Sequence, residues 1–464
     1  MNIQGNILSP FAKDHQLLLA FGFGADASAT RAWLGRMADV TASDDEVARF
    51  NDLFKSMNTR RHGERGVLKA TWVELLLTAP GLEALGIAQA EVETVSPAFA
   101  EGMAARADIL GDRQESDPST WVSPFGRGVI HAMVIIAADD REDLCREADR
   151  IEQQALDHGM SLLWRKHGNT LPQPLTGHEH FGFKDGISQP NVAGPDAVPL
   201  SEFLLGQTTA GQADPWGGST PTLPAWAQDA SLVVFRLLHQ DVAGFRAFLE
   251  QNSGALGATP QQLAAKLVGR WPSGAPLAKA PDADDPSIAE DPAQNNAFDY
   301  SDDPDGHSTP HFAHIRKVFP RKEQPNPPAG DSDERRILRR GIPYGPPLPA
   351  EGATQEGITA DRGLLFFCVQ ASLEQQFEFI QQNWCNSPDF PTGPKPPVQE
   401  YQASPGEPGD GPDPIIGQHH GQGQDNLKTP QGDHRFMLQQ FVTVRGGEYL
   451  IALSIDALKT LAST

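Results

Sequence analysis

The sequence is short of cysteine, of positive charge and of long apolar runs. Its three cysteines form no CxxC or CxxCH motif, so a disulfide framework, a zinc ribbon and a covalently attached c-type haem have no support. No run of 18 apolar residues could span a membrane, and the opening MNIQGNILSP lacks the basic and apolar regions of a secretory signal. The sequence has 37 lysines and arginines but 60 aspartates and glutamates, which gives a net charge of −23. We therefore expect a soluble, cytoplasmic protein that binds neither nucleic acid nor anionic membranes.

Length and composition suit two folded domains. At 464 residues the chain exceeds one ordinary core, and 39% hydrophobic residues are enough to fill a sizeable interior. Residues 128–159 begin as an apolar strand and continue as a helix after an acidic cap at Asp139 or Asp140. Gly159 is expected to end that helix.

The same strand–helix order occurs elsewhere in the chain. In residues 363–384 a strand precedes a helix capped by Ser372, with Gln375 three residues on as in a capping box. Residues 15–37 and 230–251 are each an apolar strand, a polar turn and an amphipathic helix. Strand–helix units therefore occur twice in each half of the sequence.

The last apolar stretch and the repeated units together predict the fold. Residues 441–453 are expected to form a strand pair around a two-residue turn at Gly446 and Gly447. The pattern predicts an α+β protein of two ferredoxin-like domains, each a four-stranded antiparallel sheet with helices packed on it. We place the N-terminal domain at residues 1–170 and the C-terminal domain at residues 171–464.

Two long segments show little periodicity. Residues 272–310 and 385–434 are rich in proline, glycine, aspartate and asparagine. Long stretches without regular structure inside a globular chain are usually functional loops or disordered segments. Because both lie beside the candidate site residues, we expect ordered loops that cover a site.

Several residues could carry chemistry, and each also has a structural interpretation. In EHFGFKDGISQP, Asp185 lies between two glycines and, taken alone, most often caps a turn. His307, His311 and His314 fall within eight residues but show no HExxH spacing, which leaves a zinc hydrolase as a weak alternative. The arginine-rich run ERRILRRGIPYG directs a guanidinium into a site or forms a solvated basic patch.

Taken together, three motifs resemble those of the dye-decolorizing peroxidases. GFKDG, HFAHIRK and ILRRGIPYG occur in that order, and further family-like segments run from residue 2 to about residue 455. These segments are NIQGNIL, GRWPSGAPL, NAFDY, FEFIQQNW, DPIIGQ and FVTVRGGEY. The long inserts are most similar to the larger C/D-type members. One departure is GHSTPHF before His314, where many members carry Cys-Pro-Phe.

The resemblance implies a haem site between the two domains. It implies one non-covalent haem b per chain, held mainly by the C-terminal domain, with His314 as the proximal iron ligand. Asp185 and Arg339 would lie on the distal side, with Arg340 as the alternative to Arg339. The residues implied to contact the cofactor are Gly182, Phe183, Gly186, Ile187, Arg316 and Arg339.

The implied activity is that of a peroxidase. Asp185 would move a proton between the two oxygens of hydrogen peroxide, while Arg339 would keep it ionised and stabilise developing negative charge. The second ring nitrogen of His314 should be held by an acid or a carbonyl, and Glu378 is a candidate. This heterolysis would use hydrogen peroxide and leave two oxidising equivalents for a second substrate.

The second substrate would be a bulky aromatic, phenolic or dye-like electron donor. Such molecules do not fit a pocket sized for peroxide, so electrons would travel from a surface aromatic over a long range. Tyr344 and Trp384 are the candidates, although both types of side chain also serve ordinary packing. The alternative function is a haem-binding or haem-handling protein with incidental peroxidase activity. Monomer and homodimer remain open.

Overall fold

The computed structural model describes residues 1–60, 68–194, 197–207, 222–321, 335–349, 357, 359–391, 410–429 and 432–464. The first half supplies four strands that lie in the order β4-β1-β3-β2, and each neighbouring pair is antiparallel. This is the strand order of a ferredoxin-like sheet. The strands are β1 (His15–Gly22), β2 (Thr71–Leu77), β3 (Ala132–Ala138) and β4 (Ser161–Asn169).

The second half repeats this order. Strands β11-β5-β8-β6 are neighbours, all antiparallel, and β7 pairs with β8 beside β6. The predicted pair of ferredoxin-like units is therefore confirmed. Its strands are β5 (Ser231–Gln240), β6 (Leu338–Arg339), β7 (Ile342–Tyr344), β8 (Gly363–Gln370) and β11 (Val442–Ala452).

The two four-stranded units are not separate sheets. Strand β11 pairs with β2 at Ile451 and Leu77, so nine strands form one sheet. The ends of this sheet approach each other, since Lys166 of β4 lies 4.1 Å above the ring of Tyr344 of β7. The placement of a domain boundary at residue 170 stays a prediction.

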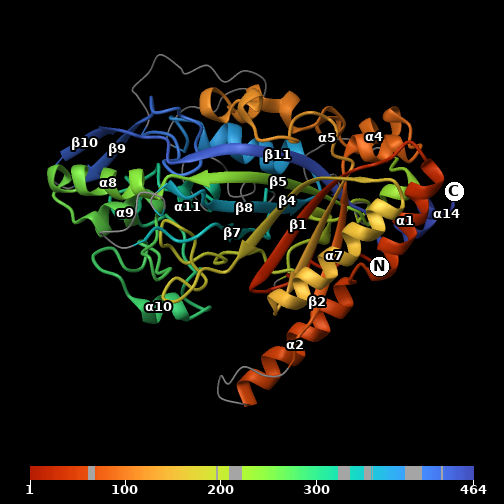
Figure 1. Cartoon of the computed structure of the whole chain (residues 1–464). Coiled ribbons are helices and arrows are strands. Elements are labelled where there is room, and N and C mark those ends of the chain that lie inside the picture. Colours follow the sequence, from red (N-terminus) through yellow and green to blue (C-terminus); the bar gives the residue numbers. More distant parts are fainter. Residues whose placement is uncertain are drawn as a thin grey trace.

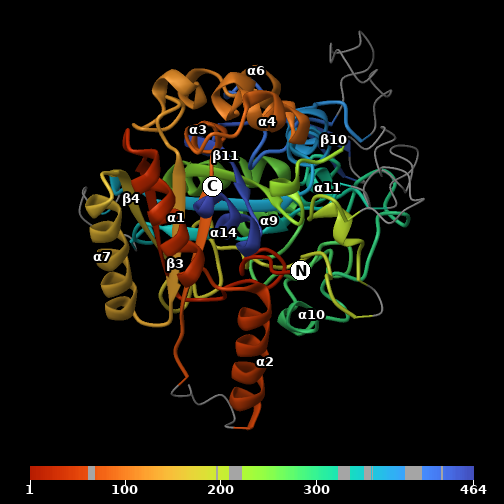
Figure 2. The ribbon, with the colours of Figure 1, turned by 90° about the vertical axis from the view of Figure 1, so that its right-hand side faces the viewer.

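Helices cover the outside of this sheet (Figure 1). Helix α7 packs on β1, β3 and β4, and α1 packs on the C-terminal helix α14. Figure 2 shows α2 extending away from the body of the protein. The longer helices are α1 (Ala27–Val40), α2 (Asp44–Arg60), α7 (Arg141–Asp157), α8 (Val242–Asn252), α9 (Pro260–Val268) and α14 (Ile455–Ser463). The shorter ones are α3 (Ala79–Ala84), α4 (Gln89–Val95), α5 (Pro97–Glu101), α6 (Ala107–Leu110), α10 (Pro286–Glu290) and α11 (His314–Val318).

The expected helix caps are present, with one change of partner. Asp140 caps α7 by accepting a hydrogen bond from the backbone N–H of Glu142. The Ser372 hydroxyl accepts from the N–H of Gln375 at 3.2 Å, but the N–H of Ser372 donates to Oε1 of Gln376 at 3.0 Å and not to Gln375. The predicted helix is present but winds as two π-helical segments, Leu373–Phe377 and Ile380–Cys385.

The predicted hairpin at Gly446 and Gly447 is wrong. Both glycines lie inside β11, which pairs with β5 along its whole length with a bulge between Val444 and Gly446. Their lack of a side chain serves close packing, because a Cβ at these positions would collide with Phe125 and Met103. Glycine in a strand interior marks such close approach as often as it marks a turn.

The loop prediction is correct in part. Residues 272–310 are ordered and contain only the short helix α10, whereas residues 385–434 include a hairpin of β9 (Gln424–Thr429) and β10 (Gly432–Met437). Residues 392–409, 430 and 431 lie outside the described part of the chain.

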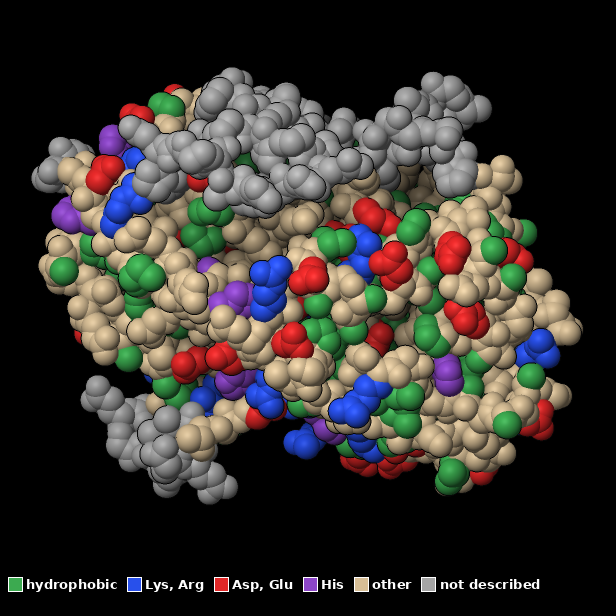
Figure 3. Space-filling model, turned by 90° about the horizontal axis from the view of Figure 1, so that it is seen from above, with side chains coloured by type: hydrophobic (Ala, Val, Ile, Leu, Met, Phe, Trp, Pro, Cys, Tyr) green, Lys and Arg blue, Asp and Glu red, His purple; other side chains and the backbone are tan. Residues whose placement is uncertain are grey.

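The described surface is mixed in character. Over the part of the chain that the structure describes, no helix is both long and apolar enough to cross a membrane. Acidic, basic and hydrophobic side chains are interspersed over the face seen in Figure 3.

A buried arginine ties the N-terminal segment to the second half of the sheet. The guanidinium of Arg340 donates to the carbonyl oxygens of Asn6 at 2.6 Å, Ile7 at 2.7 Å and Leu8 at 2.9 Å. Burial raises the pKa of the nearby Glu74 carboxyl to about 7, against the hydrogen bond from Asn6 and the charge of Arg340. Arg340 thus compensates a buried acid whenever that acid is ionised.

We predict that Arg340→Met destabilises the fold in a pH-dependent way. The variant should lose about 3–5 kcal/mol of unfolding free energy at pH 8, where Glu74 is left as an uncompensated buried charge. At pH 5, where Glu74 is protonated, the loss should be smaller. Denaturant unfolding at both pH values measures this. Arg49→Met, which breaks an exposed pair with Asp45, is the control and should change little. An equal loss at both pH values would contradict the prediction.

Candidate active site

Asp185 and Arg339 lie together, as predicted. Arg339 Nη1 donates to Asp185 Oδ1 at 3.1 Å, and Nη2 donates to the carbonyl oxygen of Ile187 at 2.6 Å. Both side chains stay about one-third exposed, 36% for Asp185 and 32% for Arg339. Gln189 fixes the backbone of Arg339 by accepting from its N–H at 3.1 Å. The acid–guanidinium pair is therefore held in place on one side and open on the other.

Glu179 shapes the loop that carries Asp185, and sequence reasoning gave it no role. Its carboxylate accepts the N–H groups of Phe181 and Phe183, both at 2.9 Å, and an amide hydrogen of Gln240 at 2.7 Å. Burial raises the pKa of this carboxyl although the three hydrogen bonds favour its ionised form. The signal for Glu179 in the sequence is local: it comes two and four residues before Phe181 and Phe183, whose backbone N–H groups its carboxylate binds.

The alternative to Arg339 is excluded by its position. The guanidinium of Arg340 is directed to the carbonyls of residues 6–8, away from the Asp185 loop.

His314 begins α11 and has an acidic partner. Its Nδ1 lies 2.8 Å from Oδ2 of Asp413, whose side chain is fully buried. The other oxygen of Asp413 accepts the N–H groups of Ile415 at 2.7 Å and Ile416 at 3.0 Å. Burial alone would raise the pKa of Asp413, but His314 and the two N–H groups hold it below its ordinary value. Because Nδ1 donates to Asp413, Nε2 keeps its lone pair for a metal.

Glu378 is not the partner of His314, and that prediction is wrong. Its carboxylate binds the guanidinium of Arg106 at 2.9 and 2.6 Å and accepts from the hydroxyl of Tyr449 at 2.8 Å. Asp413 takes the place that we assigned to Glu378. It opens the DPIIGQ segment, which the sequence singled out without giving its acid a role.

One short segment contacts both halves of the site. A side chain at Gly269 would lie 2.5 Å from Ile315, the residue after His314. Gly274 packs against Ile187, which binds Arg339, and the carbonyl oxygen of Pro272 accepts the N–H of Lys184 at 3.1 Å. Both glycines have positive φ, +90° and +102°. The His314 helix and the Asp185 loop are therefore neighbours of residues 269–274.

The residues present fit a haem. Nε2 of His314 has no hydrogen-bond partner among the described residues, and a Cβ at Gly182 or Gly186 would meet nothing within 4 Å. Both glycines have positive φ, so the open loop backbone needs them. Burial, with the like charges of Arg321 and Arg339, lowers the pKa of Arg270 to about 10. Three guanidinium groups near one another suit the two carboxylates of a haem.

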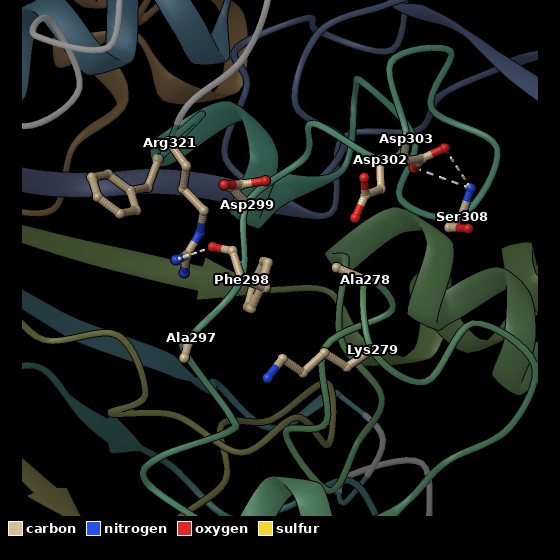
Figure 4. A pocket seen from close by; sticks show the side chains of 10 residues that line it. Ala278, Lys279, Ala297, Phe298, Asp299, Asp302, Asp303, Ser308 and Arg321 are labelled. Carbon is tan, nitrogen blue, oxygen red and sulfur yellow. Dashed lines mark hydrogen bonds between the residues drawn. The ribbon is translucent and has the colours of Figure 1, made fainter.

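A cavity of about 700 Å³ adjoins this arginine group (Figure 4). It is lined by parts of residues 278–308 and by Phe319 and Arg321. Asp185, His314 and Arg339 do not line it, so it is a side chamber and not the space between them. In Figure 4 Arg321 reaches the carbonyl of Phe298, a bond of 2.9 Å.

The other residues predicted to contact the cofactor differ in burial and in their bonding partners. Phe183 is 6% exposed and packs in a cluster with Phe245, while Ile187 supports Arg339 through its carbonyl. Arg316 is fully buried and donates to the carbonyl oxygens of Thr309 and Asp303. It therefore supports the loop before His314, and a direct contact with the cofactor stays a prediction.

Neither predicted electron-transfer residue is on the surface. Tyr344 is 1% and Trp384 is 2% exposed. The hydroxyl of Tyr344 donates to Asp361 at 3.3 Å, and the ring of Trp384 stacks on that of Phe390 with centroids 5.4 Å apart. The expectation of a surface aromatic is wrong for both.

The described residues offer no zinc site for the alternative of a zinc hydrolase. Within the described ranges, no group of three or more histidine, cysteine, aspartate or glutamate side chains is arranged to hold a metal ion. His178 bonds its own loop, and His180 donates to the carbonyl of Tyr344 at 2.8 Å.

Comparisons with known proteins match both halves of the chain. The DyP dimeric alpha+beta barrel domain matches residues 2–171, and the C-terminal Dyp-type peroxidase domain matches residues 255–403. Peroxidase 2 of Mycetinis scorodonius is 32% identical over 100% of this chain and 87% of its own length. A dye-decolorizing peroxidase of Auricularia auricula-judae is 31% identical over 98% of this chain and 86% of its own length.

Solved structures agree with these relatives. The structure of an ancestral D-type dye decolorizing peroxidase has a TM-score of 0.83 at 33% identity, covering 99% of this chain and 98% of its own. The Auricularia enzyme in complex with imidazole gives 0.81 at 31% identity, covering 100% and 99%. A deferrochelatase of Yersinia pestis is 29% identical over 44% of this chain and 36% of its own length. The fold, the full-length relatives and the two domain matches place this chain in the dye-decolorizing peroxidase family, as a haem-dependent peroxidase of the larger C/D type.

Proposed function

We propose that the chain binds one non-covalent haem b between His314 and the Asp185–Arg339 pair. It would reduce hydrogen peroxide and oxidise bulky aromatic, phenolic or dye-like donors. The observation that carries this proposal is the pairing of a carboxylate-held histidine with an open acid–guanidinium pair on either side of residues 269–274. Storage of haem needs only the histidine, whereas a positioned acid beside an arginine serves proton transfer.

Asp185 is the proton carrier in this proposal. When bound, the haem supplies the redox-active iron that peroxide oxidises. Asp185 takes the proton from one peroxide oxygen and returns it to the other, which makes that oxygen leave as water. Its Oδ1 is engaged by Arg339 and by the N–H of Gly186 at 2.6 Å, and this fixes the carboxylate in the loop.

Arg339 supports Asp185 on one side of the haem site, and Asp413 supports His314 on the other. Arg339 hydrogen-bonds Asp185 at 3.1 Å and places positive charge where negative charge develops on the leaving oxygen. Asp413 orients the ring of His314 and raises the electron-donating strength of Nε2. Neither residue changes its own protonation in this scheme.

Electrons from a bulky donor would enter through buried aromatics. Trp384 stacks on Phe390, which is partly exposed, and the carbonyl of Phe390 accepts a hydrogen bond from Lys317 of the His314 helix. Trp384 therefore lies between the surface and the proximal side. Tyr344 lies beneath the half-exposed Asp361 and near the distal loop through His180.

A haem-handling role is the second candidate, because a deferrochelatase matches 44% of the chain. The two functions separate in a stopped-flow experiment on the haem-loaded protein with one equivalent of peroxide. A peroxidase shows a fast absorbance change that an aromatic donor reverses. A haem-handling protein shows slow bleaching that the donor does not reverse.

His314→Ala should abolish or strongly weaken haem retention, because the iron loses its protein ligand. The Soret absorbance of the purified, haem-saturated variant after gel filtration measures this. His307→Ala, which removes an exposed histidine of the same loop, is the control and should retain haem. A full, unshifted Soret band in His314→Ala would refute the ligand assignment.

Asp185→Asn and Arg339→Leu should keep haem and react slowly with peroxide. Loss of the proton carrier should slow that step by about 10²–10⁴-fold, and loss of the guanidinium by about 10²–10³-fold. The second-order rate constant with peroxide is the measurement. Lys184→Met removes a neighbouring cation of the loop and should react at nearly the rate of the unmodified protein. Unchanged peroxide kinetics in both site variants would rule out the distal roles.

Trp384→Phe should lose most activity toward a bulky anthraquinone dye while keeping its reaction with peroxide, because phenylalanine is much harder to oxidise. Tyr344→Phe is the comparison for the second candidate. Steady-state dye oxidation beside stopped-flow peroxide kinetics distinguishes them. Wild-type dye oxidation by both variants would show that electrons enter elsewhere.

A further inference from the structure

A second histidine–aspartate pair lies beside the first. His311 and His314 are three residues apart, and so are their partners Asp410 and Asp413. His311 Nδ1 lies 2.5 Å from Oδ2 of Asp410, and His314 Nδ1 lies 2.8 Å from Oδ2 of Asp413. The two segments 311–314 and 410–413 are thus joined at both ends by the same kind of contact.

His311 is more deeply buried than His314. The side chains of His311 and Asp410 are 2% and 7% exposed, whereas His314 is 24% exposed. The second ring nitrogen of His311, Nε2, lies 3.0 Å from the carbonyl oxygen of Pro304. His311 is therefore enclosed, and it has no open face toward a ligand as His314 has.

Both ring nitrogens of His311 face hydrogen-bond acceptors. A carboxylate oxygen and a carbonyl oxygen both accept, so the geometry of the two contacts suits a ring that donates from both nitrogens. Asp410 is its ionised counterpart. Burial alone would raise the pKa of Asp410, but His311 and Lys428 lower it to about 2. The contacts of His311 thus differ from those of His314, whose Nε2 must stay unprotonated to bind a metal.

Asp410 also connects the segment 410–413 to strand β9. Lys428 of β9 donates to its Oδ2 at 2.7 Å, and Asn426 of β9 donates its backbone N–H to the carbonyl oxygen of Asp410 at 2.9 Å. At the other end, the N–H of Asp413 donates to the carbonyl oxygen of Cys385 at 2.8 Å. Backbone hydrogen bonds from residues 385 and 426 thus hold the segment 410–413, and its two aspartates bond His311 and His314.

We infer that His311 is a positioning residue for the haem ligand. Its ion pair with Asp410 fixes the segment 410–413 against the segment 311–314, so that Asp413 keeps its hydrogen bond to Nδ1 of His314. This inference rests on the proposed role of His314 as iron ligand. His311 belongs to the GHSTPHF stretch, in which this chain departs from the Cys-Pro-Phe pattern of the family it resembles.

The charge state of His311 can be tested without haem. In apo-protein labelled with ¹⁵N-histidine, the His311 ring should show two protonated nitrogens at pH 7. Its resonances are identified by their disappearance in His311→Gln. A ring with one protonated nitrogen would overturn the inference, whatever the variants do.

The positioning role is tested on the haem-loaded protein by resonance Raman spectroscopy of the ferrous state. Glutamine can donate to Asp410 or to Pro304 but supplies no charge, so His311→Gln should loosen Asp413. The iron–histidine stretch should move to lower frequency, and haem affinity should fall roughly 10-fold or more. A merely structural loss of stability would not move that frequency.

Lys428→Met is the matched control. It removes the other cation from the same oxygen of Asp410 while the bond from His311 remains. Its iron–histidine stretch should stay at the wild-type position even if its thermal stability falls as far as that of His311→Gln. An unshifted stretch in His311→Gln, or equal shifts in both variants, would overturn the positioning role.

Failure here is distinguishable from failure of the proposed function. If His314→Ala loses haem but His311→Gln keeps the wild-type frequency, the ligand assignment stands and the positioning role falls. If His314→Ala keeps an unshifted Soret band, the proposed function itself fails.

Discussion

The buried carboxylate of Asp413 is the constraint on which the site depends. A fully buried aspartate without partners would be strongly destabilising, and this one is satisfied by His314 and by two backbone N–H groups of its own turn. The turn is tight, since a side chain at Gly417 would lie 2.9 Å from the carbonyl oxygen of Cys385. Asp413 therefore has one orientation, it gives His314 one tautomer, and Nε2 is left to face outward from α11.

The sheet brings the opposing groups to the same place. Arg339 ends the two-residue strand β6 at the edge of the nine-stranded sheet, and Asp185 lies in the loop that Glu179 fastens to Gln240, the last residue of β5. The segment 269–274, which follows α9, then packs between that loop and α11. Short-range capping and turn chemistry build each loop, and long-range packing aligns them. The Asp185–Arg339 pair and His314 thus lie on separate segments of the sequence and are brought near the same residues, 269–274, by packing.

Sequence patterns predicted the parts that repeat or that lie in compact motifs. The strand–helix order predicted two ferredoxin-like units, and the linked motifs predicted that Asp185 and Arg339 would meet. The candidate partner of His314 was Glu378 in the FEFIQQNW segment, but the actual partner, Asp413, lies 99 residues from His314 in a loop without periodicity. The glycines of β11 have the composition of a turn, and only the rings and sulfur packed on them explain their place in a strand. Burial of Tyr344 and Trp384 likewise depends on neighbours distant in sequence.

The proposed function requires that His314 holds one haem per chain. The most direct test is a titration of the apo-protein with haem b, followed by absorption spectroscopy and analytical ultracentrifugation at the haem wavelength. We expect saturation at one haem per chain, with a Soret band that sediments with the protein. A titration that does not saturate, or that saturates well below one haem per chain in fully folded protein, would contradict it.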